Sequence, residues 1–480
     1  MTSPDPASFP GGDVHAAPKP PAPLRPHGRR DAEAGGESSA ADPQSGRFGR
    51  AKAFRFPAHF LWGAATASHQ VEGDNRWNDW WAFEQAGRLP HRSGEACRHY
   101  ELFEADFDLA RSWGHNAHRF SIEWSRIEPA EGEWNAGAVE HYRRVIAALR
   151  ERGMEPIVTL HHFTNPQWFA VRGGWARRDS VERFRRYAEF TAARLSRHVR
   201  YWVTINEPTV YAKRGFVGGQ WPPFRHGSWL TAAMVVRNMI RAHDSAYAAL
   251  HERRPDAMVG IAHSAPFIAA CDPRSAADRI CTAIRDYIFN DSLFELFGAG
   301  RRLDFLGINY YARQVVRWRT RGASSILGAE CREDHHDEPR RFNALGWEIY
   351  PAGLRSVLEK FSRFGVPLIV TENGIAADDD ITRRDFLLEH LTVLSDCVDS
   401  GIDVRGYMHW SLMDNFEWAE GTTARFGLAA VDYATQARTP RAVALAYAAV
   451  CLSHALAMSR PGDSIAMSRD PRPPIESAGR

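Results

Sequence analysis

Two carboxylates stand out because each one closes a short apolar run and is followed by a turn. Glu207 ends the run YWVTINE and precedes Pro208, and Glu372 lies in PLIVTENG, just before Asn373 and Gly374. A glutamate at the end of an apolar strand is seldom an ordinary solvated surface residue. Two such carboxylates can divide the work of catalysis, because one can donate a proton while the other attacks or activates water.

Further polar and aromatic side chains occur within or just after the other apolar runs. They are Gln70, Arg119, His162, Asn206, Asn309, Tyr311, Trp410, Glu417 and Trp418. Amides and charged groups bind hydroxyls, and an indole face packs on the C–H face of a sugar. Together with two carboxylates, this mix is what cleavage of a glycosidic bond requires. No Ser/His/Asp arrangement and no nucleophilic cysteine context accompanies it, so the pattern predicts chemistry on a carbohydrate.

Eight apolar runs must position these side chains. They are Phe60–Thr66, His115–Trp124, Glu155–Phe163, Tyr201–Glu207, Met258–Pro266, Asp304–Tyr311, Pro367–Gly374 and Val404–Leu412. Several are apolar on both faces, which is typical of parallel strands covered on both sides. Amphipathic stretches fall between most of them, so we predict a single (β/α)8 barrel, in which all strand ends converge on one mouth. An open doubly wound sheet is the alternative, but no GxGxxG turn follows any strand.

Helical stripes support this alternation. Apolar residues recur at helical spacing over Val139–Leu149, over Phe184–Leu195 and over Leu354–Phe361. A further helix is expected to start at Pro440, after the last strand. The barrel is predicted to span residues 53–458. Residues 1–52, rich in Pro, Gly, Ala and charge, and residues 459–480 are predicted to be disordered tails, because they cannot bury enough apolar surface.

Composition narrows the class of partner. The formal net charge of the 480 residues is only +2, so electrostatics give no case for nucleic acid or an anionic membrane. No apolar stretch is long enough to span a bilayer, and the N-terminus lacks the features of a secretory signal, so we predict a cytoplasmic location. The six scattered cysteines are interpreted as reduced, structural thiols. No metal or cofactor is implied, and a small-molecule substrate is the partner expected. The oligomeric state is not predicted.

The motifs themselves are recognisable, and the chain resembles glycoside hydrolase family 1, the β-glucosidase and β-galactosidase family. The resemblance runs from about Phe56 to Ala455. The motifs that carry it are ASHQVEG (67–73), RFSIEWSRI (119–127), TLHHF (159–163), TINEP (204–208), GINYY (307–311), GWEIYP (346–351), VTENG (370–374) and HWSLMDNFEWAEG (409–421). Each is weak alone, but eight in the order of the family are specific.

The resemblance implies a role for each candidate. Glu207 is expected to be the catalytic acid/base and Glu372 the nucleophile, with Arg119 and Tyr311 contacting Glu372. Asn309 is expected to support Glu207 and Tyr311. The sugar is expected to be held by Gln70, His162, Asn206, Glu417 and Trp418, with Trp410 as its stacking floor.

The implied reaction is hydrolysis of a terminal non-reducing β-D-hexose through a covalent glycosyl-enzyme, with retention of configuration. For retention we expect the two carboxyl groups to lie about 5–5.5 Å apart. A neutral hexose is favoured over a 6-phosphosugar, because Glu417 would repel a phosphate. Glucose, galactose and fucose are not distinguished.

Two regions depart from the family or stand out from the barrel. Phe163–Thr164–Asn165–Pro166 replaces the Trp-Asp-Leu-Pro common in the family, so the preference for the leaving group cannot be carried over. The long polar loop from Ala312 to Leu345 is predicted to be a rim or lid of the pocket.

Two other functions fit the same barrel. A sugar-binding pseudoenzyme would keep Trp410 and Glu417 but need not keep both catalytic carboxylates. An enzyme that transfers the glycosyl group to an alcohol would share every active-site residue, and only its products would tell it apart.

Overall fold

The computed structural model describes residues 53–319, 327–332 and 339–457. Eight parallel strands close into a barrel in the order β11-β12-β2-β3-β4-β5-β6-β8. Their bounds are β2 Leu61–Ala65, β3 Ala117–Ser121, β4 Glu155–His161, β5 Tyr201–Asn206, β6 Met258–Ser264, β8 Phe305–Asn309, β11 Leu368–Asn373 and β12 Val404–Trp410. Each strand lies within one of the eight predicted runs, so the predicted barrel is confirmed and the open-sheet alternative is wrong.

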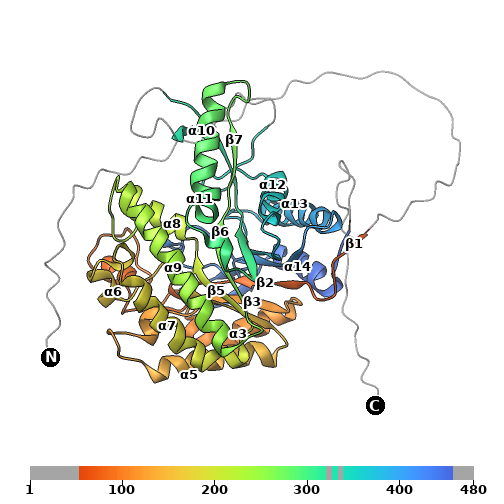
Figure 1. Ribbon diagram of the computed structural model, residues 1–480. Helices are drawn as coiled ribbons and strands as arrows, with labels where there is room; N and C mark the ends of the chain where they lie inside the picture. The colour runs from red at the N-terminus through yellow and green to blue at the C-terminus, as the bar shows by residue number, and fades with distance from the viewer. Residues whose placement is uncertain (1–52, 320–326, 333–338, 458–480) are drawn as a thin grey trace, which may run out of the picture. The chain divides into compact units, whose positions relative to one another are not determined.

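Helices surround this barrel (Figure 1). The longer ones are α3 (His99–Ser112), α5 (Ala136–Glu151), α7 (Ser180–Leu195), α9 (Trp229–Arg253), α10 (Ala276–Asp286), α12 (Pro351–Ser362), α13 (Asp380–Asp399) and α14 (Ala442–Ser453). The three predicted stripes lie in α5, α7 and α12 and are confirmed, since their apolar residues are the buried ones. The helix expected from Pro440 starts two residues later, because Pro440 ends a short strand, β14 (Arg438–Pro440).

Shorter helical segments occupy the loops around the barrel. They are α1 (Ser68–Val71), α2 (Asp79–Gln85), α4 (Trp124–Ile127), α6 (Gln167–Val171), α8 (Pro208–Ala212) and α11 (Ser292–Glu295). Two π-helical turns, Lys213–Val217 and Tyr287–Asp291, follow α8 and α10. The first of these turns follows α8, which begins directly after the predicted acid/base Glu207, so it lies near the mouth of the barrel.

A small additional sheet was not predicted. It has three strands in the order β10-β9-β7, formed by β7 (Phe267–Ala270), β9 (Arg313–Arg317) and β10 (Ala329–Glu330). Strands β9 and β10 belong to the long loop expected at the rim, of which residues 320–326 and 333–338 lie outside the described residues. Figure 1 shows β7 beside α10, away from the ring of helices α5, α7 and α9.

The ends of the described chain pair with each other. Strand β1 (Ala53–Arg55) runs antiparallel to β15 (Ala455–Ala457), and β13 (Ala429–Val431) pairs with β14. The predicted tails, residues 1–52 and 459–480, lie outside the described residues. All six cysteines are buried. Within the described ranges, no helix is both long enough and apolar enough to cross a membrane.

Candidate active site

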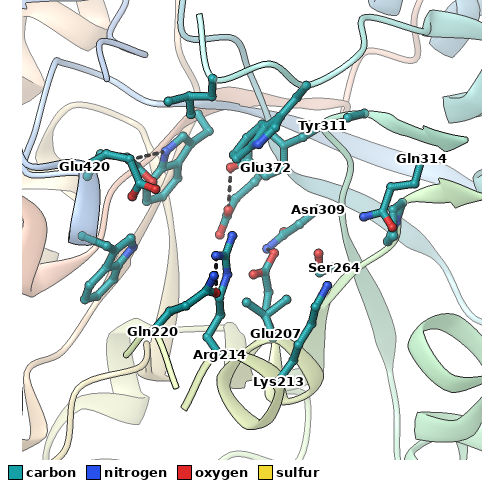
Figure 2. Close-up of a pocket in the computed structure, with 18 of the residues that line it drawn as sticks. Glu207, Lys213, Arg214, Gln220, Ser264, Asn309, Tyr311, Gln314, Glu372 and Glu420 are labelled. Atoms are coloured by element: carbon teal, nitrogen blue, oxygen red, sulfur yellow. Dashed lines mark hydrogen bonds between the residues drawn. The ribbon is translucent and has the colours of Figure 1, made fainter. Parts of the chain in front are cut away.

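A cavity of about 470 Å³ lies at the carboxyl ends of the barrel strands (Figure 2). Eight of the predicted site residues line it directly: His162, Glu207, Asn309, Tyr311, Glu372, Trp410, Glu417 and Trp418. The other three, Gln70, Arg119 and Asn206, are buried beneath these and hydrogen-bonded to them. The structure therefore brings together all eleven residues that the sequence singled out.

Glu372 is held through both of its carboxylate oxygens. Arg119, on β3, donates to Oε1 in a buried ion pair, and the hydroxyl of Tyr311 donates to Oε2 at 2.7 Å. Two donors, one of them cationic, stabilise the ionised form of the carboxylate. Glu372 is therefore held in place by one cationic and one neutral donor.

The strand end that carries Glu372 is anchored from behind. The side chain of Asn373 donates to the carbonyl of Tyr310 at 2.7 Å and accepts from the hydroxyl of Tyr407 at 2.7 Å. The next residue is Gly374, where an added Cβ would lie 1.8 Å from the backbone oxygen of Trp410. Asn373 and Gly374 thus fix the end of β11 against β8 and β12, and this sets the position of Glu372.

Glu207 lies just beyond β5 in a left-handed conformation, with φ 46° and ψ 57°. The following Pro208 disfavours the right-handed helical region at Glu207 and starts α8. A non-glycine residue at positive φ is strained by about 1–2 kcal/mol, and such strain is often found at functional sites. The turn aims the carboxyl into the cavity, where Figure 2 shows it beside Asn309 and Ser264.

The surroundings of Glu207 oppose ionisation. Burial, followed by the nearby charge of Glu372, raises the pKa of Glu207 to about 8, and hydrogen bonds from Asn309 and Ser264 only partly oppose this. The amide of Asn309 donates to Oε1 of Glu207 at 2.9 Å. Glu207 is therefore protonated at neutral pH, while its neighbour Glu372 has the partners of an anion.

Asn206 connects the two halves of the site. Its side-chain oxygen accepts from Arg119 at 2.7 Å and from Asn309 at 3.2 Å, and its Nδ2 lies 3.2 Å from Nε2 of His162. Burial, reinforced by the charge of Arg119, holds the pKa of His162 well below its ordinary value. His162 is thus a neutral ring, and its Nε2 accepts the hydrogen bond from the Asn206 amide.

A second hydrogen-bonded group lies around Glu417. Gln70 donates to Oε2 of Glu417 at 3.1 Å, and the indole nitrogen of Trp410 donates to the same oxygen at 3.4 Å. Burial and then the charges of Glu420 and Glu372 raise the pKa of Glu417 to about 8. At neutral pH Glu417 is therefore mostly protonated, and this end of the cavity is crowded with acidic groups.

Aromatic rings complete this end of the cavity. The ring of His162 stacks at 5.9 Å on Trp410 and at 6.1 Å on Trp418. Trp418 is also in contact with Trp80, Phe163 and Trp221. The indole of Trp418 is thus packed among other rings and buried, and Trp418 also lines the cavity.

Several residues that line the cavity were not anticipated from the sequence. They are Lys213, Arg214, Gln220, Trp221, Ser264, Arg285, Arg313, Gln314, Glu330, Trp347 and Glu420. Most come from helices, from the small sheet or from the loop 312–345 rather than from strand ends. No cluster of three or more His, Cys, Asp or Glu side chains that could hold a metal ion occurs within the described ranges.

Comparisons with known proteins agree with this geometry. The sequence profile of glycosyl hydrolase family 1 matches residues 52–296 and 285–455. The chain is 31% identical to β-glucosidase A of Thermotoga maritima, covering 80% of this chain and 95% of that one. It is also 31% identical to a β-galactosidase of Pyrococcus woesei, covering 80% and 94%. Among solved structures, a β-glycosidase from Pyrococcus horikoshii superimposes with a TM-score of 0.79 at 41% identity, covering 84% of this chain and 96% of that one.

Proposed function

The chain belongs to glycosyl hydrolase family 1 and is a glycoside hydrolase of the β-glucosidase type, and from this premise we propose that it works by a retaining, two-step mechanism with Glu372 as nucleophile and Glu207 as acid/base. The observation that carries this assignment is the contrast between the two carboxyl groups. Glu372 accepts hydrogen bonds from Arg119 and Tyr311, whereas burial raises the pKa of Glu207 to about 8. Paired carboxyl groups whose environments differ in this way take opposite roles in catalysis.

In the first step, an oxygen of Glu372 attacks the anomeric carbon of the sugar while Glu207 transfers its proton to the glycosidic oxygen. The bond to the leaving group breaks, and a covalent glycosyl-enzyme forms with inverted configuration. In the second step, Glu207, now a carboxylate, removes a proton from water, which displaces Glu372 and inverts the anomeric carbon again. Arg119 and Tyr311 would keep Glu372 oriented before attack and would stabilise it as the leaving group.

For the sugar, we propose a neutral hexose placed between Glu372 and the group formed by Gln70, Trp410 and Glu417. The acidic surroundings of Glu417 support this, because Glu372 and Glu420 are both close enough to raise its pKa. A phosphate at this end would face three carboxyl groups. Two of the three similar proteins named above are a β-glucosidase and a β-galactosidase, so a glucoside and a galactoside are the first substrates to compare.

Stereochemistry tests the proposal most directly. The enzyme would be given 4-nitrophenyl β-glucoside, β-galactoside and β-fucoside, and the first sugar released would be followed by proton NMR before mutarotation. We expect the β-anomer to appear first. Early release of the α-anomer would exclude the retaining mechanism, and a tight sugar complex without any turnover would favour the pseudoenzyme. A large share of transfer product in the presence of an alcohol would identify the transferring enzyme.

A further inference from the structure

One wall of the cavity carries an excess of positive charge. Lys213 begins the π-helical turn that follows α8, Arg214 is next to it, and Arg285 lies near the end of α10. All three line the same cavity as Glu207. Figure 2 places Lys213 and Arg214 on the side of Glu207 and Ser264, with Glu420 across the cavity from Lys213.

Other cations of the cavity are neutralised by carboxylates. Arg313 donates to both oxygens of Glu348, and Arg332 lies 3.4 Å from Glu330. Within the described part of the chain, neither Lys213 nor Arg285 has a carboxylate at ion-pair distance. The ammonium of Lys213 lies 4.5 Å from the ring centre of Phe289 instead.

The remaining contacts of these cations are neutral or missing. Arg214 donates to the amide oxygen of Gln220 at 2.6 Å. The Nε of Arg285 is buried and has no hydrogen-bond acceptor among the described residues. A buried cationic donor that has no hydrogen-bond acceptor destabilises the fold. Such a donor in the wall of a cavity therefore suggests that a bound ligand supplies the acceptor.

The three charges also act on one another. Burial, then Arg285 and Arg214, lower the pKa of Lys213 to about 8, and Glu330 is the acidic group that opposes this. Lys213 is still mostly protonated at pH 7. The wall therefore presents a concentrated positive field close to the catalytic acid.

This basic wall lies on the side of the cavity where the leaving group would bind, not on the side that holds the sugar. Glu207 protonates the glycosidic oxygen in the proposed mechanism, and Lys213 follows Glu207 by six positions on the same segment. The sugar end is defined by Trp410 and Glu417, where acidic groups gather. The cavity thus has an acidic end for the sugar and a basic wall beyond the scissile bond.

We propose that Lys213, Arg214 and Arg285 bind an oxyanion carried by the leaving group, so that the enzyme prefers β-glycosides whose aglycone bears a carboxylate, sulfate or phosphate. The inference rests on the proposed function and adds the chemical class of the aglycone to it. Guanidinium groups bind planar oxyanions through paired N–H donors, and a neighbouring ammonium adds a point charge. The oxygens of the anion would accept hydrogen bonds from the donors that now lack an acceptor.

The test compares three aryl β-glycosides of the sugar that the enzyme hydrolyses best. Their aglycones are 4-(carboxymethyl)phenol, 4-(phosphonomethyl)phenol and the neutral 4-(carbamoylmethyl)phenol, in which a methylene group insulates the phenol from the substituent. We expect kcat/KM to be about tenfold higher for an anionic substrate than for the amide, since a hydrogen bond to a charged group is worth that much. The larger of the two anionic effects identifies the oxyanion that fits better.

Variants connect the preference to the wall. Lys213→Gln and Arg285→Gln should each bring the ratio of anionic to neutral kcat/KM closer to one. Arg274→Gln, which removes a charge that is 93% exposed outside the cavity, should leave the ratio as in wild type. If a variant fails to fold, raising the salt concentration with wild-type enzyme gives the same information, because the ratio should fall as the field is screened.

The outcomes separate the two levels of the proposal. Equal hydrolysis of the three substrates would overturn the oxyanion site and leave the glycosidase function intact. Turnover of none of them would contradict the proposed function itself. A preference for anions that survives both substitutions would show that other groups cause it and would overturn the assignment to this wall.

Discussion

The hydroxyl of Tyr311 donates a hydrogen bond of 2.7 Å to Oε2 of Glu372. Tyr311 lies two residues beyond the end of β8, and β8 pairs in parallel with β11, where Asn309 is opposite Glu372. Arg119 occupies the other oxygen of the same carboxylate. Glu372 therefore cannot rotate freely, and its orientation toward the cavity is set by two residues that come from different parts of the sequence.

Loss of the Tyr311 hydroxyl should slow catalysis without unfolding the protein. For Tyr311→Phe we expect kcat/KM to fall about 10- to 100-fold, because a hydrogen bond to a charged group is lost. Tyr310→Phe is the matched control, since the neighbouring hydroxyl donates to the carbonyl of Tyr350 at 2.6 Å, outside the cavity. That control should lose about 1 kcal/mol of stability and keep its kinetics. Equal kinetic losses in both variants would argue against a specific role for Tyr311.

Removal of the nucleophile should abolish almost all turnover. We expect Glu372→Ala to lower kcat on the order of 10⁴-fold or more, because no covalent intermediate can form. Azide should restore turnover of an activated aryl β-glycoside and give the α-glycosyl azide, since the anion attacks in place of Glu372. Glu359→Ala, on the exposed face of α12, is the control and should keep full activity. A β-configured azide product would contradict the assignment.

The pH dependence of the reaction should reflect Glu207. Its raised pKa, about 8, keeps the acid form present through neutral pH, where an ordinary glutamate would be ionised. We therefore expect kcat/KM for a substrate with a poor leaving group to fall as the pH rises through about 8. Glu207→Gln should lose this alkaline limb together with most of its activity, although a dinitrophenyl glycoside should still react in the first step. An alkaline limb near pH 5 in the wild type would contradict the predicted state of Glu207.

Stability should depend on pH through Glu417. Its pKa is about 8 in the folded protein and near 4.5 when unfolded, so the folded state retains a proton that the unfolded state releases between these values. The sign is a loss of stability as the pH rises from 4.5 to 8. The variant Glu417→Gln cannot ionise at this position. We therefore expect the difference in Tm, variant minus wild type, to be about 2–4 °C larger at pH 8.5 than at pH 4.5. Glu359→Gln should show no such change, and a constant difference between wild type and Glu417→Gln across the pH range would refute the assignment.

The barrel and its catalytic mouth could be predicted because both depend on local patterns. Each strand is a run of apolar residues, and polar residues at the carboxyl end of such a run must lie at the mouth once the strands are parallel. This reasoning placed Glu207 and Glu372 in one cavity, although they are far apart in the chain. The distance between their carboxyl groups, the role of each site residue and the cytoplasmic location remain predictions.

Other features have no local signal. The strands β7, β9 and β10 are two to five residues long, and their pairing brings together segments that no periodicity connects. Arg285 lies on a helix and Lys213 on a π-helical turn, positions that usually face solvent.

The sequence by itself determined the family of the chain, the eight strands and the polar groups at their ends, because these depend on neighbouring residues and on the geometry common to all parallel barrels. Only the tertiary structure decided which charges meet in the cavity. Burial and neighbouring charges raise the pKa of Glu207 and Glu417. Lys213 and Arg285 meet in the same cavity without a carboxylate partner among the described residues. Both results depend on distances between segments that are far apart in the chain.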